Sequence, residues 1–314
     1  LGFILKAGGF QFFNYYPVMA EAMLELLQEP SVPLQICAIE AFAISYYQFR
    51  KVPPECVEPC KTFLSAVISI LKSEKKNDLS QKMIESCNHS ICILIKVLGI
   101  NFIQFADDVL PTAIENAGAS IEVTTVGAMD FANERFSFQI SIPTVGVSGV
   151  KQFVNKSDVQ SICKSLEIID AAEKAMMNEF QPYLDASVKV ASQWLTSQYH
   201  IEPIMISSCN ILRNAVRISY ANRCFTTENL ELITELYLQN ITPLSSQKLI
   251  ESLLLVIQDA FFLPCNQDLS EAIKIKVLET IPEIIEITLD RKMKIINDKQ
   301  QWQTLEISNK EIDK

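Results

Sequence analysis

The stretch NFIQFADDVLPTAIEN, Asn101 to Asn116, decides the fold class of this chain. Its apolar residues recur three or four positions apart, a spacing that gathers them on one face of an α-helix and leaves the acidic residues outside. The preceding run, Gln81 to Leu98, repeats the pattern, and Gly99-Ile100 alone separates the two, so we expect a sharp turn between two helices. A helical hairpin of this kind needs a further hairpin on each side to bury its apolar faces. The apolar positions of the first stretch are Phe102, Phe105, Val109, Leu110 and Ile114.

The same pattern recurs along the chain at a nearly constant interval. Helices that begin near residues 12, 55 and 102 are 43 and 47 residues apart, and later starts near 180, 225 and 269 are 45 and 44 apart. Such an interval is typical of HEAT-type helical pairs, which repeat every ~40 to 47 residues. The chain is therefore predicted to be an all-α solenoid. The expected helices are 12–28, 33–49, 55–72, 81–98, 101–116, 157–177, 180–196, 203–219, 227–240, 245–262 and 269–289.

One segment departs from the helical pattern. Phe136, Phe138, Ile140 and Ile142 alternate with polar residues and are followed by the turn-prone VGVSG and by Val150. Alternation with period two predicts a β-hairpin inserted between two helices. The alternation favours an ordered insertion, whereas the preceding AGASIEVTTVGAMD favours a mobile segment. The predicted organisation is HEAT-type repeats at 1–119, the insertion at 120–155, repeats at 156–290, and a charged tail or the edge of a further insertion at 291–314.

The composition indicates a densely helical chain and limits the kinds of partner that we expect. The chain has 314 residues, of which 49% are hydrophobic and 8 are glycine, which excludes disorder and argues against phosphate-cradling loops. The net charge is −10 and the pI is near 4.9, so the chain lacks the overall basic charge of a nucleic-acid binder. An acidic chain favours basic partners, or the charge serves solubility alone. No uninterrupted apolar run reaches the ~18 residues that span a bilayer, so we expect no membrane insertion. The absence of an initial methionine indicates a piece of a longer protein.

Residues for catalysis or for a cofactor are sparse. The chain contains 2 histidines and neither a GxGxxG nor a GxxxxGK[ST] motif, so we expect no enzyme activity and no bound cofactor. A zinc site remains a weak alternative to packed, reduced thiols, because the spacing of its candidate ligands is irregular. Those ligands are Cys56, Cys60, Cys87, His89 and Cys92.

Three quoted stretches carry a resemblance to a known family. They are FQFFNYYPVMAEAMLELLQ from Phe10, KMIESCNHSICILIKVLGINFIQFADDVLP from Lys82, and FSFQISIPTVGVSGVKQFVN from Phe136, which continues in the same likeness to Leu195. In this order, and with the strand-like insertion between two helices, they resemble the middle of the importin-β (karyopherin-β) superfamily of nuclear import receptors. The likeness is to the branch that carries ribosomal proteins and histones. It implies a HEAT superhelix with second helices on the concave face, cargo release by RanGTP mainly through a missing N-terminal part, contacts to phenylalanine-glycine nucleoporins, and shuttling between cytoplasm and nucleus.

Two loops depart from the family's pattern. Relatives carry acidic runs where this chain has KSEKKND, Lys72 to Asp78, and MDFANER, Met129 to Arg135. Partner contacts made by those acidic loops are therefore in question for this chain.

Polar residues on the second helices are the candidate cargo-binding site. On the concave surface they would form a ladder of carboxylates and amides that could bind the lysines and the backbone of an extended basic nuclear-localisation signal. The alternative for each of them is a solvated helix face. The predicted residues are Glu40, Glu85, Asn88, Glu167, Asp170, Asn210, Asn214, Glu251 and Asp259.

A scaffold subunit of a trafficking or phosphatase complex is the rival function, because it would share every periodicity. The insertion at about 121–155 argues against it, since a plain scaffold has no need of such a segment. A helical enzyme is the third class, and it lacks a convergent catalytic set.

Overall fold

The computed structural model describes residues 15–46, 54–73, 80–127, 139–142, 150–197, 199–222, 227–241, 245–262 and 271–282, together with short pieces at 284–286, 289–290 and 293. The chain divides into two compact units, Leu1–Cys224 and Phe225–Lys314. The predicted helix ends at 12–14 and 47–49 and almost all of the charged tail lie outside the described residues.

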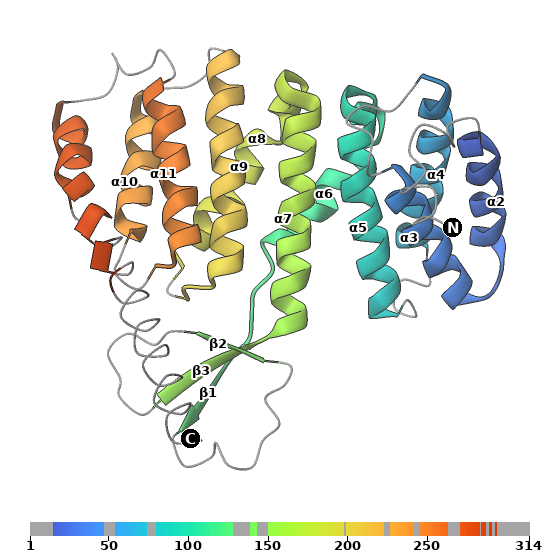
Figure 1. The fold of residues 1–314 in the computed structure, drawn as a ribbon, viewed down its shortest axis with the longest axis horizontal. Coiled ribbons are helices and arrows are strands. Elements are labelled where there is room, and N and C mark those ends of the chain that lie inside the picture. Colours follow the sequence, from blue (N-terminus) through green and yellow to red (C-terminus); the bar gives the residue numbers. More distant parts are fainter. Residues whose placement is uncertain are drawn as a thin grey trace, which may run out of the picture. The chain divides into compact units, whose positions relative to one another are not determined.

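The first unit is a stack of helical hairpins (Figure 1). Within each hairpin the first helix packs on the second, and each second helix packs on the second helix of the next hairpin. The first helices are α2 (Tyr16–Gln28), α4 (Pro54–Lys72), α6 (Ala106–Ala117) and α8 (Gln181–Leu195). The second helices are α3 (Val32–Tyr46), α5 (Gln81–Leu98), α7 (Lys156–Met176) and α9 (Glu202–Ala221). The predicted fold class, an all-α solenoid with a β insertion, is confirmed.

The junction between α5 and α6 corrects one helix. The predicted helix 101–116 is α-helical only from Ala106, because residues Gly99–Phe105 form the 3-10 helix η3. Gly99 ends α5 with φ 55° and ψ −131°, and its backbone N–H donates to the Ile95 carbonyl. The chain then turns tightly before α6 begins. A second junction of the same kind joins α7 to α8, where Met177 has φ 51° and ψ −118° and begins the 3-10 helix η5 (Met177–Phe180).

The insertion is a three-stranded antiparallel sheet. Its strands β1 (Val123–Gly127), β2 (Gln139–Ile142) and β3 (Val150–Asn155) have the order β1-β3-β2, with Thr125 opposite Gln152 and Ser141 opposite Phe153. The predicted pairing of β2 with β3 is confirmed, whereas β1 was not predicted. The predicted turn and Phe136 and Phe138 lie outside the described residues. β3 runs directly into α7, whose N-terminus is capped by the Asn155 side chain accepting from the Ser157 N–H at 3.0 Å.

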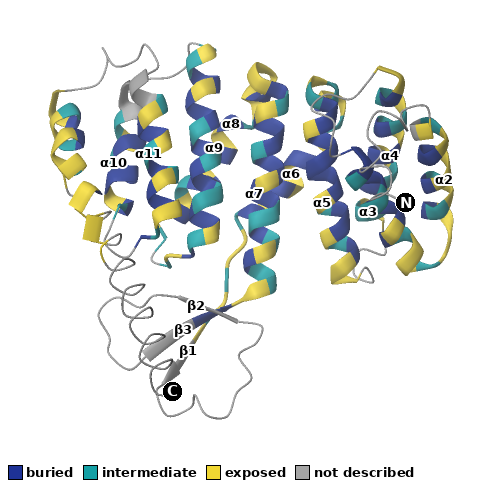
Figure 2. Cartoon of the chain, in the orientation of Figure 1, coloured by how far each residue is buried: buried dark blue, intermediate teal, exposed yellow. Residues whose placement is uncertain are grey.

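The core is made of buried apolar residues, and Figure 2 colours the buried positions of the helices dark blue. Phe42 of α3 stacks on Phe63 of α4 with ring centroids 3.7 Å apart, and the indole N–H of Trp194 in α8 donates to the Ala117 carbonyl at the end of α6 at 2.7 Å. The segment Gln81–Ala117 is long and apolar enough to cross a membrane by length and composition alone, a property that core helices share, and 56% of its most apolar window is buried.

The second unit contains the helical pair α10 (Thr227–Asn240) and α11 (Gln247–Phe262) and a helical stretch at 271–282. Tyr237 and Leu253 are fully buried in this unit. Lys276 reaches Glu235 of α10, with its Nζ atom 3.3 Å from the carboxylate. The predicted helix 269–289 is described as helix at 271–282 and in the short pieces that follow.

Candidate peptide-binding groove

The predicted ladder falls on successive second helices. In the first unit Glu40 lies on α3, Glu85 and Asn88 on α5, and Glu167 and Asp170 on α7, while α9 carries Asn210 and Asn214. Because α3, α5, α7 and α9 pack in sequence, these residues share one layer of the stack. Glu251 and Asp259 lie on α11 in the second unit.

Four of these residues, Glu40, Glu85, Asn88 and Glu167, line one cavity of about 470 Å³ between α3, α5 and α7. We call this cavity the groove. The rest of its lining was not predicted. Those further lining residues are Gln81, Lys82, Ile84, Ser86, His89, Gln160, Ser161, Cys163 and Lys164.

Each carboxylate of the groove accepts one bond from within the chain. The Ser86 hydroxyl donates to Glu40 at 2.7 Å, and the Gln81 amide donates to Glu85 at 3.1 Å. Lys164 pairs with Glu167, with its Nζ atom 2.6 Å from Oε2. Since an ionised carboxylate offers about four lone-pair sites, all three retain acceptor capacity toward a ligand.

Two neutral groups complete the groove. Burial, and then the nearby Lys164 ammonium, hold the pKa of His89 below its usual value, so the imidazole is uncharged at pH 7. Burial raises the pKa of Cys163 to about 11, so it remains a thiol. The groove therefore offers uncharged donors and acceptors beside its three carboxylates.

Asp170 and Asn214 do not line the groove and are bonded to each other. Asn214 is buried, and its side-chain nitrogen donates to Asp170 at 2.8 Å and to Glu173 at 3.2 Å. Lys174 also pairs with Asp170 at 2.7 Å. The Asn214 nitrogen thus forms a link between α9 and α7 in place of the solvent-facing amide that the ladder required.

The cysteines are arranged as core residues. Cys56 and Cys60 are buried on α4, and Cys87 and Cys92 are buried on α5. Burial raises the pKa of Cys87 to about 12, so it remains a thiol at neutral pH. Within the described residues no three ligating side chains are grouped to hold a metal ion. Cys37 on α3 is an exception, because it is exposed.

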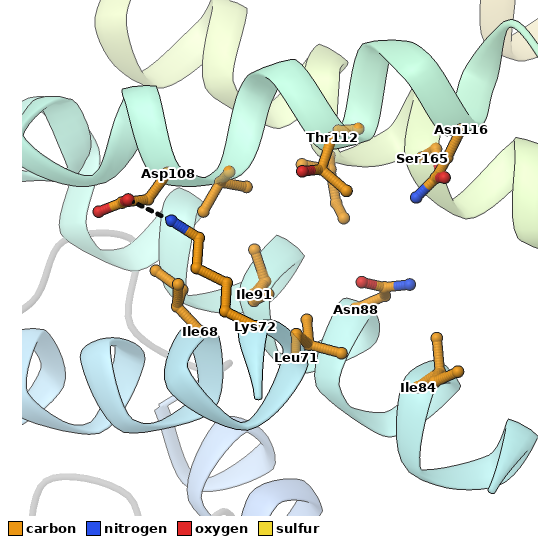
Figure 3. A pocket seen from close by; sticks show the side chains of 13 residues that line it. Ile68, Leu71, Lys72, Ile84, Asn88, Ile91, Asp108, Thr112, Asn116 and Ser165 are labelled. Atoms are coloured by element: carbon orange, nitrogen blue, oxygen red, sulfur yellow. Dashed lines mark hydrogen bonds and ion pairs between the residues drawn. The ribbon is translucent and has the colours of Figure 1, made fainter. Parts of the chain in front are cut away.

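A second cavity, of about 420 Å³, lies among α4, α5, α6 and α7. We call it the apolar pocket. Its walls are mostly aliphatic, and Figure 3 shows the paired Lys72 and Asp108 side chains at one edge of it. Its aliphatic lining consists of Ile68, Leu71, Ile84, Ile91, Val109, Ala113 and Ile168.

Helical hairpins stacked through their second helices, with a polar groove along those helices, define a HEAT-type solenoid. No protein-family model and no curated protein matches the sequence. Among solved structures, Kap121p bound to RanGTP is similar, with a TM-score of 0.71 and 13% identity over 93% of this chain and 28% of that one.

Two further complexes of the same karyopherin are also similar. Kap121p bound to Pho4p has a TM-score of 0.61 at 13% identity, over 90% of this chain and 30% of that one. Kap121p bound to Nup53p has a TM-score of 0.58 at 14% identity, with the same coverage of 90% and 30%. The chain thus has a karyopherin-like solenoid fold and spans less than a third of the length of these structures.

Proposed function

We propose that this chain is part of a nuclear transport receptor that binds a basic nuclear-localisation segment of its cargo in the groove. The observation that carries the proposal is the convergence of Glu40, Glu85, Asn88 and Glu167, from three successive second helices, on one cavity of a karyopherin-like solenoid. Ribosomal proteins and histones are the proposed cargo class. For the whole receptor we propose release by RanGTP and shuttling between cytoplasm and nucleus.

The groove's chemistry fits an extended basic segment. Carboxylates on α3, α5 and α7 would each accept from a lysine ammonium, and Asn88 between them could bond to the peptide backbone. Asp170 and Asn210 would continue this surface along α7 and α9, and Glu251 and Asp259 are the proposed contacts in the second unit. Binding should weaken as salt rises, because these contacts are largely electrostatic.

The test is a fluorescence-anisotropy titration with a labelled lysine-rich nuclear-localisation peptide at about 50 mM and about 150 mM salt, beside a scrambled acidic peptide. Saturable, salt-sensitive binding of the basic peptide alone is expected. Joint reversal of Glu85→Lys and Glu167→Lys should abolish it, since two attractive charges become repulsive. A joint reversal of Glu167 and Asp170 is less suitable, because Asp170 also anchors Asn214.

A matched control keeps the change in net charge. Glu115→Lys and Glu179→Lys alter exposed residues on α6 and η5 that do not line the groove. This control should bind like the unmodified chain. Equal binding by the groove variant and the unmodified chain would remove the groove from the proposal, and no binding at either salt would favour the scaffold function.

The apolar pocket suits the nucleoporin contacts that the family likeness implies. Its aliphatic walls could bury a phenylalanine ring of a phenylalanine-glycine repeat. Leu71→Asp places a charge in the pocket and should eliminate binding of a phenylalanine-glycine repeat peptide, measured by the same titration. Ile103→Asp on η3, an exposed apolar residue away from the pocket, is the control and should bind normally. Normal binding by Leu71→Asp in a folded protein would place nucleoporin contacts elsewhere.

A further inference from the structure

We propose that Lys164 is an internal competitor for the groove, which occupies the Glu167 carboxylate and lowers the groove's affinity for lysine-rich segments. This inference rests on the proposed function and assigns Lys164 as a residue that determines specificity. It implies that a cargo lysine competes with a lysine of the receptor itself for Glu167.

The position of Lys164 sets it apart from the other donors in the groove. It lies one helical turn before Glu167 on α7 and pairs with it at 2.6 Å. The Lys164 side chain is 27% exposed and that of Glu167 is 47% exposed, so the carboxylate is more open to solvent than the ammonium that neutralises it. An incoming cation can therefore reach Glu167 from solvent and exchange with Lys164.

The other two carboxylates are held by neutral donors. Glu40 accepts from a hydroxyl and Glu85 from an amide, so both keep their full negative charge toward a ligand. Of the three, Glu167 alone is paired with a cation among the described residues. The groove thus presents two open carboxylates and one that is already neutralised.

The field of Lys164 extends to the opposite wall. After burial, its positive charge is the largest cause that lowers the pKa of His89 on α5. The ammonium therefore acts across the groove from α7 to α5 and repels a second cation placed between them. Removal of this charge should both release Glu167 and strengthen the attraction for a basic segment.

The test compares the unmodified chain with Lys164→Gln, Lys164→Arg and Lys189→Gln, each titrated with the same lysine-rich peptide at about 50 mM salt. Lys164→Gln should lower Kd by about threefold to tenfold, since one competing ion pair and one repulsive charge are lost. Lys164→Arg keeps the charge and should leave Kd within about twofold. Lys189→Gln, an exposed change on α8 with the same effect on net charge, should do likewise.

A second readout needs no peptide. The pKa of His89, followed by NMR, should rise in Lys164→Gln and stay in place in Lys189→Gln. Peptide binding with equal Kd in Lys164→Gln and the unmodified chain would overturn the role of Lys164 and leave the proposed function intact, as would equal tightening by Lys189→Gln. Absence of peptide binding in all four proteins would overturn the proposed function and the competitor with it.

Discussion

Glu173 is a fully buried carboxyl group between α7 and α9. It accepts from Asn214 at 3.2 Å through Oε2, while Oε1 has no hydrogen-bond partner among the described residues. Burial raises its pKa well above the ordinary value of 4.5, Asp170 adds to the increase, and the Asn214 bond and Lys174 oppose it. The folded protein therefore binds this proton more tightly than the unfolded chain.

The raised pKa of Glu173 makes the stability of the folded protein depend on pH. The stabilising contribution is fully present below pH 4.5 and is lost as pH rises through the raised pKa of the folded state. Glu173→Gln keeps an acceptor for Asn214 and cannot ionise, so it should raise the free energy of unfolding at neutral and alkaline pH by about 1 to 3 kcal/mol. Urea unfolding between about pH 4 and about pH 9 checks this. Parallel curves for the two proteins would show that Glu173 does not titrate in this range.

Single residues were the part of the site that the sequence predicted least well. Glu40, Glu85 and Glu167 could be selected because each carries a carboxylate or amide group beside an apolar stripe on a second helix. Asn214 satisfies the same rule, yet it is buried and links two helices, because its exposure depends on how closely α9 packs on α7. Lys164 and His89 were missed as groove residues. The ion pair of Lys164 with Glu167 lies on the polar side of α7, and the effect of Lys164 on His89 joins α7 to α5, so the apolar periodicity reports neither.

In the described part of the chain, the junctions from α5 to α6 and from α7 to α8 use the same backbone turn with different residues. Gly99 and Met177 both combine a positive φ with a strongly negative ψ, a conformation that favours glycine. Met177 is the one non-glycine residue with positive φ in the described part of the chain. A strained residue at an exposed position should therefore be improved by glycine.

Met177→Gly should raise the free energy of unfolding by about 1 kcal/mol, since ~1 to 3 kcal/mol of backbone strain is relieved and ~0.5 to 1 kcal/mol is lost to the greater freedom of glycine in the unfolded chain. Gly99→Ala should lower it by about 1 to 3 kcal/mol. A Cβ atom at residue 99 meets nothing within 4 Å, so this loss would report the backbone alone. Chemical denaturation of both variants measures the effects. An increase in the free energy of unfolding for Gly99→Ala would contradict backbone strain at this position.

Helices were predicted well and the irregular elements were not. The observed α5 (Gln81–Leu98) and α10 (Thr227–Asn240) have the predicted bounds, because their apolar periodicity and end signals agree. The 3-10 turns were missed, since periodicity does not distinguish the first turn of a helix from a tighter one. β1 was missed because it pairs with β3, more than twenty residues later, and a strand so short is decided by its partner.

The repeated fold itself was recoverable because a solenoid is built from contacts between neighbouring repeats. One interval, read along the chain, therefore fixes the architecture without any long-range pairing. The division into two compact units was not predicted, since the period continues across residues 224 and 225. The proposed choice of a transport receptor over a scaffold rests on two sequence features, the insertion and the polar residues of the second helices.

The repeat architecture and the two compact units lead to a prediction about how instability spreads. Leu253 of α11 is fully buried, and Leu253→Ala leaves a cavity that should cost about 2 to 5 kcal/mol. In a solenoid, stability is approximately a sum of repeat and nearest-neighbour terms, so the loss should remain near the altered repeat. Hydrogen exchange should therefore accelerate in α10 and α11 and stay unchanged in α3 and α5.

Leu64→Ala in α4, also fully buried, is the reciprocal control and should accelerate exchange in α2 to α5 while α10 and α11 keep their protection. Uniform acceleration along the chain by either substitution would show that the two units unfold as one cooperative body.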